Sequence, residues 1–272
     1  MKLLIVMVVL LLRQQGHLAE PAAAIGHLVR RWRDGWLQRG QREGWAAPLV
    51  LMLIVLLPAL VLALLMGVVS GLWQHLLEAA LGLVVLALIL FDRTLPDVMA
   101  RAKNRLATTE TAVVAGVILD AELMRVRREL AEEQFRELFA PLFWFLLLGP
   151  VAALVYYLLR LMVSADELPS DSPAPRCLHW MEWPAARVLA LGFALAGDFT
   201  ATWQHWRRVV FEREAPALDL LEDAATAAQP VRLEAGAGRD ELLLALESVS
   251  ALFRRTLVLW VVLLALHTLF GF

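Results

Sequence analysis

The alternation of apolar and polar positions is most informative over 138–162, where 22 consecutive residues beginning at Leu138 carry no charge. An α-helix needs about 20 apolar residues to cross a bilayer. Pro141 lies near the start of this stretch, where a missing N–H costs little. Pro150 lies in its middle and leaves the carbonyl of Leu146 without its helical donor, so a neighbouring helix, a Ser/Thr hydroxyl or a water must supply one. We predict a single spanning helix over 138–162, kinked at Pro150.

Other apolar stretches predict further membrane helices. The stretch 46–67 contains Pro58, which predicts a kink. Only a short polar break separates it from 76–91, so the two stretches are expected to form a tight helical hairpin. The predicted spans are 46–67, 76–91, 138–162, 183–199 and 256–270, and a retained apolar helix over 3–12 is short for a span.

The stretch 183–199 differs from the others because small residues recur in it every four positions, at Ala186, Ala190 and Ala194. This spacing lets helices approach closely in lipid. The stretch is short for a span, so we expect it to be tilted, partly embedded or covered by its neighbours. The proline-rich segment 164–176 that precedes it is typical of a loop.

Two large polar segments, 92–137 and 200–250, alternate with the apolar stretches. In the first, apolar residues recur at spacings of four, three and four, which predicts one face of an amphipathic helix. That face comprises Leu119, Leu123, Val126 and Leu130. The charged residues of the same segment lie mostly off this face, as in a solvated helix that leads directly into the predicted span 138–162.

Composition supports a membrane protein and excludes several other classes. The chain of 272 residues is 60% hydrophobic, with a mean hydropathy of +0.65, whereas soluble domains are about 45–50% apolar. No apolar run of period two is present to form a sheet. The fold class predicted is therefore all-α, a polytopic membrane helix bundle with helical cytoplasmic segments. The lone Cys177 excludes an internal disulfide.

Charge gives an orientation and argues against nucleic acid as a partner. The net charge is −2, and the mixture of Arg and Trp over 17–44 precedes a long apolar run, as in an interfacial segment. Basic residues number six in 13–46, eight in 92–137 and seven in 200–255, but only one in 161–186. Because basic loops remain in the cytoplasm, we expect the first three segments there and 164–176 in the periplasm.

The sequence contains none of several common catalytic or metal-binding motifs. It has no Walker A, GxSxG, HExxH or CxxC motif, and its six histidines show no metal-ligand spacing, so we predict neither a metal nor a cofactor. Ionisable residues near membrane helix ends are functional candidates, although they also pair with each other or extend to headgroups. Arg136 and Arg187 are expected inside the bundle, near the cytoplasmic ends of their helices, and paired with acids such as Glu132 or Glu133. The full candidate cluster is Glu132, Glu133, Arg136, Tyr156, Arg160 and Arg187.

A resemblance to a known family rests on two stretches of the sequence. The first contains Gln134, Phe135, Arg136, Ala140, Pro141, Leu142, Phe143, Trp144, Phe145, Gly149 and Pro150, and the second begins at Trp183 and Arg187 and continues A-L-G-F-A-L-A-G. Together they resemble the AmpE family of bacterial inner-membrane proteins. The resemblance implies a multi-pass inner-membrane protein that takes part in signalling around induction of chromosomal β-lactamase. Its implied partners are the lipid bilayer and a muropeptide-pathway protein or ligand linked to a peptidoglycan-recycling amidase.

The first stretch is also similar to the CobD/CbiB membrane enzymes, which attach an aminopropanol group to a corrinoid acid. That pattern places an Asp where this chain has Arg136, and it has Asn, Thr and Asp positions after the Gly-Pro pair that Leu158–Val163 do not supply. Amide formation on anionic substrates needs placed carboxylates. We therefore expect no corrinoid synthesis and no catalytic activity. The alternative that stays open is an enzyme or carrier for an anionic amphiphile on this scaffold.

Overall fold

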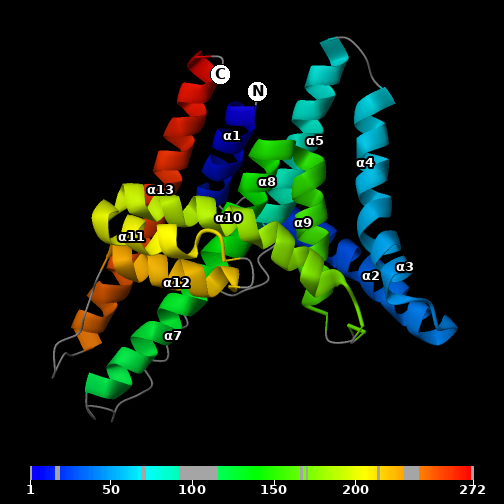
Figure 1. Ribbon diagram of the computed structural model, residues 1–272. Helices are drawn as coiled ribbons and strands as arrows, with labels where there is room; N and C mark the ends of the chain where they lie inside the picture. Colours follow the sequence, from blue (N-terminus) through cyan, green and yellow to red (C-terminus); the bar gives the residue numbers. More distant parts are fainter. Residues whose placement is uncertain are drawn as a thin grey trace. The chain divides into compact units, whose positions relative to one another are not determined.

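The computed structural model describes residues 2–15, 19–68, 72–91, 116–165, 168–169, 171–212, 215–229 and 239–270. All regular elements within these ranges are helices, and the ranges contain no strand (Figure 1). The predicted all-α class is confirmed. Residues 92–115 and 230–238 of the two predicted polar segments lie outside the described residues.

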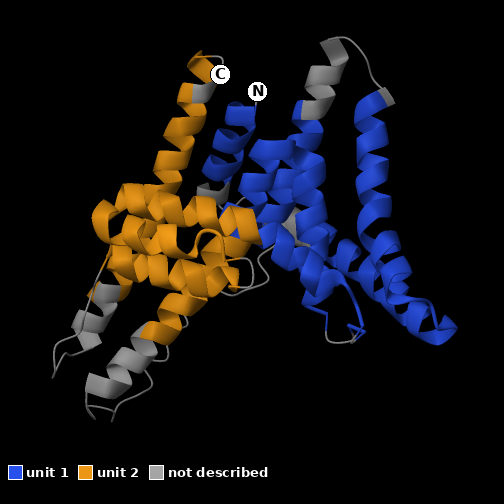
Figure 2. Ribbon diagram, viewed as in Figure 1, with its two compact units in different colours: residues 1–93, 137–182 blue, residues 94–136, 183–272 orange. Residues whose placement is uncertain are grey.

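The chain divides into two compact units (Figure 2). Unit 1 comprises residues 1–93 and 137–182, and unit 2 comprises 94–136 and 183–272. The helices of unit 1 are α1 (Lys2–Gln15), α2 (Ala19–Glu43), α3 (Ala47–Leu51), η1 (Met52–Leu56), α4 (Leu57–Val68), α5 (Leu72–Phe91), α8 (Ala140–Leu148) and α9 (Pro150–Val163). Those of unit 2 are α7 (Gly116–Gln134), α11 (Phe199–Val209), α12 (Ala217–Ala228) and α13 (Arg239–Phe270). Of the three boundaries between the units along the chain, two fall within η2 (Phe135–Phe139) and α10 (Ala174–Ala196), and the third follows residue 93.

Two helical stretches are long and apolar enough to cross a membrane, judged by length and composition. The first is Ala47–Gly67, with 21 residues and a mean hydropathy of 3.2, and the second is Leu246–Phe270, with 25 residues and a mean hydropathy of 1.9. Only 28% and 22% of their most apolar windows are buried. A core helix of a soluble protein would be buried over most of its surface. The low burial therefore favours membrane association. The first stretch matches the predicted span 46–67 to within one residue, and the second contains the predicted span 256–270.

The predicted single helix over 138–162 is wrong, because the chain reverses direction at Gly149. This residue has φ 91° and ψ −169°, and it ends α8 and begins α9. The two helices pack along each other (Figure 1). Near the end of α8, the Leu146 carbonyl accepts from Lys2 at the start of α1, whereas near the end of α9 the Leu161 carbonyl accepts from Arg33 of α2. A positive φ that suits glycine, followed by a proline, produces a helical hairpin where a kink was expected.

Two π-helical turns precede prolines at the same spacing. The turn η1 ends two residues before Pro58, and η2 ends two residues before Pro141. A proline inside a helix has no N–H to donate, and its ring clashes with the carbonyl four residues earlier. A wider turn accommodates both effects, and such π-bulges are common in helices at functional sites. The helix is therefore locally widened before Pro58, and the kink expected there stays a prediction.

The small-residue stretch 183–199 belongs to a longer helix than predicted. Its residues 183–196 form the second part of α10, which begins at Ala174 and contains Pro184. Its alanine face is fully buried, as the spacing predicted. Within unit 2, a methyl group added at Gly192 would lie 2.7 Å from Thr256 Cγ2, so α10 approaches α13 closely. This helix is not among the two stretches that qualify as membrane spans.

The amphipathic face predicted in 92–137 lies on α7 and packs against the other helices of unit 2. Val126 and Leu130 are buried, and α7 contacts both α12 and α13. The side chains of Leu119 and Leu123 lie outside the described residues. Arg128 of α7 joins α12 by donating to Asp219 Oδ1 at 2.8 Å and to Glu222 Oε2 at 3.3 Å.

Candidate functional site

The six polar residues predicted as a cluster are divided between the two units. Glu132, Glu133, Arg136 and Arg187 belong to unit 2, and Tyr156 and Arg160 belong to unit 1. Each group is therefore considered in its own unit.

Arg136 pairs with an acid, as predicted. Its guanidinium donates to the Glu132 carboxylate one helical turn earlier. Both side chains are partly exposed, with 28% and 36% of their surfaces accessible. The neighbouring Glu133 is buried. An exposed pair four residues apart in a helix contributes only about 0.3–0.5 kcal/mol, so the pair itself has a modest structural role.

Arg187 is buried, as predicted, but its hydrogen-bond acceptors are main-chain carbonyls of unit 2. Its side chain is 4% exposed. Nε donates to Val210 O at 2.8 Å, one terminal nitrogen donates to Trp183 O at 3.0 Å, and the other donates to Glu212 O. The guanidinium carbon lies 4.0 Å from the centre of the Trp183 ring. The prediction that Arg187 pairs with Glu132 or Glu133 is not supported by these contacts.

The end of α11 explains this choice of acceptors. The last carbonyls of a helix have no partner inside the helix and attract a cation. Val210 caps α11 and Glu212 follows it closely, so their carbonyls face the planar fork of Arg187. Trp206 of α11 returns a hydrogen bond from Nε1 to Arg187 O at 3.0 Å. We call the interlocked set Trp183, Arg187, Trp206, Val210 and Glu212 the arginine clasp.

Arg187 stays protonated in the arginine clasp because a guanidinium group is a very strong base. Burial lowers the pKa of Arg187 below its ordinary value, and the Glu212 carboxylate opposes this shift. Arg127 of α7 behaves in the same way, since burial lowers its pKa and Glu222 opposes the change. Arginine remains charged in proteins at neutral pH, so both residues act as permanent cations.

A buried pair in unit 1 joins the α8–α9 hairpin to the first half of α10. The Tyr156 hydroxyl donates to Glu182 Oε1 at 3.4 Å, and both residues are buried. Trp144 Nε1 donates to Met181 O at 3.2 Å beside it. Arg160 and Glu137 are also buried in this unit. The arrangement offers a carboxylate held in an apolar environment by a phenol, which suits either a structural link or proton transfer.

The sequence interpretation missed Glu137 and Glu182, although a signal for both was present. The apolar positions Val126 and Leu130 continue at spacings of three and four to Glu133 and Glu137. In α10 the same spacing places Glu182 between the buried Leu178 and Ala185. An acid on the apolar face of a helix is expected to be buried.

A metal site finds no support in the part of the chain that the structure describes. Those residues include no group of three or more His, Cys, Asp or Glu side chains that could hold a metal ion. Comparison with known proteins gives no further assignment: no family model matches the chain, and no curated protein or solved structure matches it.

Proposed function

We propose that the protein is a regulatory protein of the bacterial inner membrane that acts, without catalysis, in the pathway linking peptidoglycan recycling to induction of β-lactamase. The pathway is the one implied by the resemblance to the AmpE family. The proposal includes insertion of several helices, since Lys2–Leu12, Ala79–Phe91 and Pro150–Val163 are shorter apolar helices beside the two candidate spans. Its expected partners are the bilayer and a muropeptide-pathway protein or ligand.

The observation that carries the proposal is that the residues shared with the AmpE family shape the helices and their contacts. Pro141 follows a π turn, and Gly149 with Pro150 reverses the chain. Trp144 binds a main-chain carbonyl, and Arg187 directs all its observed hydrogen bonds to carbonyls of its own unit. Residues used in this way build a defined scaffold and do not present reactive groups. Such a scaffold suits a protein that acts by contact.

Deletion and complementation test this function. We expect removal of the gene to change β-lactamase activity after exposure to an inducing β-lactam, and wild-type protein to restore it. Arg187→Ala should fail to restore it, because the carbonyls at the end of α11 lose two donors and Trp183 O loses a third. The matched control is Arg208→Ala, which removes an exposed arginine of α11. Unchanged induction after deletion would contradict the proposed pathway.

A second candidate, an enzyme or carrier for an anionic amphiphile, is favoured by the buried Tyr156–Glu182 pair. Glu182→Gln keeps the shape of the side chain and removes its charge. Under this alternative, Glu182→Gln protein would accumulate to normal levels in the membrane yet change the anionic lipids found by mass spectrometry of membrane extracts. A regulatory scaffold predicts an unchanged lipid profile.

A further inference from the structure

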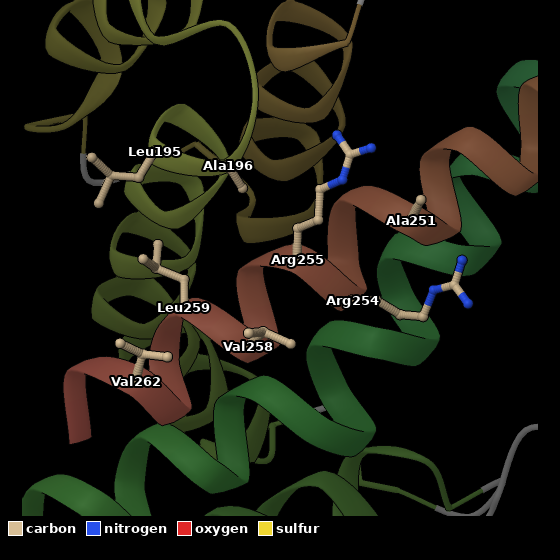
Figure 3. A pocket seen from close by; sticks show the side chains of 8 residues that line it. All are labelled: Leu195, Ala196, Ala251, Arg254, Arg255, Val258, Leu259 and Val262. Carbon is tan, nitrogen blue, oxygen red and sulfur yellow. The ribbon is translucent and has the colours of Figure 1, made fainter. Parts of the chain in front are cut away.

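An open groove lies between the end of α10 and α13 in unit 2 (Figure 3). It has a volume of about 700 Å³. Leu195 of α10 and Val258, Leu259 and Val262 of α13 form its apolar part, and Arg254 and Arg255 form its basic end.

The apolar part of the groove is uncovered. Leu195, Val258 and Val262 are 54%, 62% and 47% exposed. Val258 and Val262 belong to the candidate membrane span Leu246–Phe270, and Leu195 of α10 lines the same groove. Exposed apolar side chains on a membrane helix face either acyl chains or another helix.

The basic end of the groove distinguishes between these occupants. Arg254 and Arg255 are exposed, and neither has an ion-pair partner among the described residues. They directly precede the apolar run that begins at Thr256. A second apolar helix would leave two cations without counter-charge, whereas a lipid phosphate accepts hydrogen bonds from guanidinium groups.

We propose that this groove binds one anionic phospholipid, with its phosphate on Arg254 and Arg255 and an acyl chain along Val258 and Val262. From Arg255 to Val262 the helix rises about 10 Å, at 1.5 Å per residue, so the groove accommodates the upper part of one chain. Each basic side chain close to the membrane surface adds to the attraction for anionic lipids, and basic pockets beside membrane helices bind anionic headgroups. The inference goes beyond the regulatory role and depends only on the membrane placement of α13.

The close approach of α10 and α13 keeps the groove in shape. Thr256 is fully buried, and its hydroxyl donates to Leu252 O at 3.0 Å. Phe193 packs edge-on against Phe253, with ring centres 5.0 Å apart. Because these contacts fix the crossing of α10 and α13, the groove beside the crossing presents a preformed surface, which lowers the cost of ordering a ligand.

Native mass spectrometry of the full-length protein in detergent micelles tests the proposal. The probes are phosphatidylglycerol and phosphatidylcholine with identical acyl chains. We expect phosphatidylglycerol to bind about ten-fold more tightly, and the double variant R254Q/R255Q to reduce this ratio to about one. The matched control is R207Q/R208Q, an adjacent exposed pair on α11, which should keep the ratio. Val258→Trp should weaken binding of both lipids.

Two results would overturn the proposal. One is a preference for phosphatidylglycerol that survives in folded R254Q/R255Q protein. The other is a disulfide-linked dimer formed through Val262→Cys in a Cys177→Ser background, since a second copy would then cover the groove. Carbonate washing of native membranes checks the placement of α13 separately, because release of the protein by the wash would contradict it. The lipid-binding readout does not depend on β-lactamase induction, so a failure of lipid binding is distinguishable from a failure of the proposed pathway.

Discussion

Lys2 Nζ donates a hydrogen bond to the carbonyl oxygen of Leu146 at 2.8 Å, which joins the start of α1 to the last turn of α8. The sequence predicted that this carbonyl needs an outside donor, because Pro150 has no N–H to offer it. The donor is the cation of a neighbouring helix. A positive charge at a helix C-terminus is also favoured by the helix dipole.

Replacing Lys2 tests this link. Lys2→Met keeps most of the apolar stem and removes the donor, so we expect a loss of about 0.5–1.5 kcal/mol in the free energy of unfolding. Lys2→Arg should restore most of it. Thermal unfolding of the detergent-solubilised protein measures both variants. Equal melting of Lys2→Met and wild-type protein would show that the hydrogen bond contributes nothing.

The second prediction concerns the turn of the α8–α9 hairpin. Gly149→Ala places a Cβ on a backbone with φ 91°, a conformation that costs an L-residue about 1–3 kcal/mol. The expected result is a lower melting temperature. Gly35→Ala is the matched control, because Gly35 lies inside α2 with nothing within 4 Å of an added Cβ. That change should be neutral or stabilising by up to about 1 kcal/mol. A milder effect at Gly149 than at Gly35 would contradict the hairpin geometry.

These cases show how far the sequence determines the fold. Helix class, the two long apolar stretches and the buried alanine face follow from composition and spacing, which are local properties. The reversal at Gly149 was missed because a proline after glycine fits both a kink and a hairpin, and only the sign of φ separates them.

The candidate site was predicted less completely, for a physical reason. The Arg136–Glu132 pair is one turn apart in a single helix, so spacing alone predicts it. Arg187 binds Val210 and Glu212, more than 20 residues away, and its acceptors are carbonyls that every residue possesses. Side-chain identity therefore carries no signal for that contact. The unpaired end of α11 becomes evident only when the two helices are packed together.

The third prediction compares the two arginines directly. Arg187→Ala removes three donors from a buried site, and we expect a loss of about 3 kcal/mol or more in the free energy of unfolding. Arg136→Ala removes a partly exposed pair as well as contacts beyond it, and its loss should be smaller. Arg39→Ala, at an exposed residue 5.4 Å from the ring of Trp36, serves as the surface control. Thermal unfolding ranks the three, and Arg187→Ala must be the most destabilised.

Substituting Arg187 by lysine adds a sharper version of that test. Lysine keeps the charge but cannot direct planar donors to three separate carbonyls. Arg187→Lys should therefore resemble Arg187→Ala more than wild-type protein. A lysine variant as stable as wild type would show that charge alone holds the clasp together.

The fourth prediction concerns the approach of α10 to α13. A Cβ at Gly192 would meet Thr256 Cγ2 at 2.7 Å and Trp260 Nε1 at 3.2 Å. Thr256 is β-branched and its hydroxyl is bonded to Leu252 O, so the methyl group cannot easily turn away. Gly192→Ala should cost about 1–3 kcal/mol. Gly67→Ala, with nothing within 4 Å, is the control, and equal melting of the two variants would contradict close packing.

The last prediction concerns which side of the membrane the chain reaches after α9. Since α8 and α9 run in opposite directions, the end of α9 returns to the end of unit 1 at which α8 begins. The basic segment before α8 is expected in the cytoplasm. Ser164, which caps α9 and is exposed, should therefore also be cytoplasmic, and this reverses the expectation from sequence for 164–176. In a Cys177→Ser background, Ser164→Cys should react with a membrane-impermeant maleimide only after spheroplasts are lysed. Labelling of intact spheroplasts would mean that the chain crosses between Glu137 and Ser164, as a spanning helix requires and a helical hairpin does not allow.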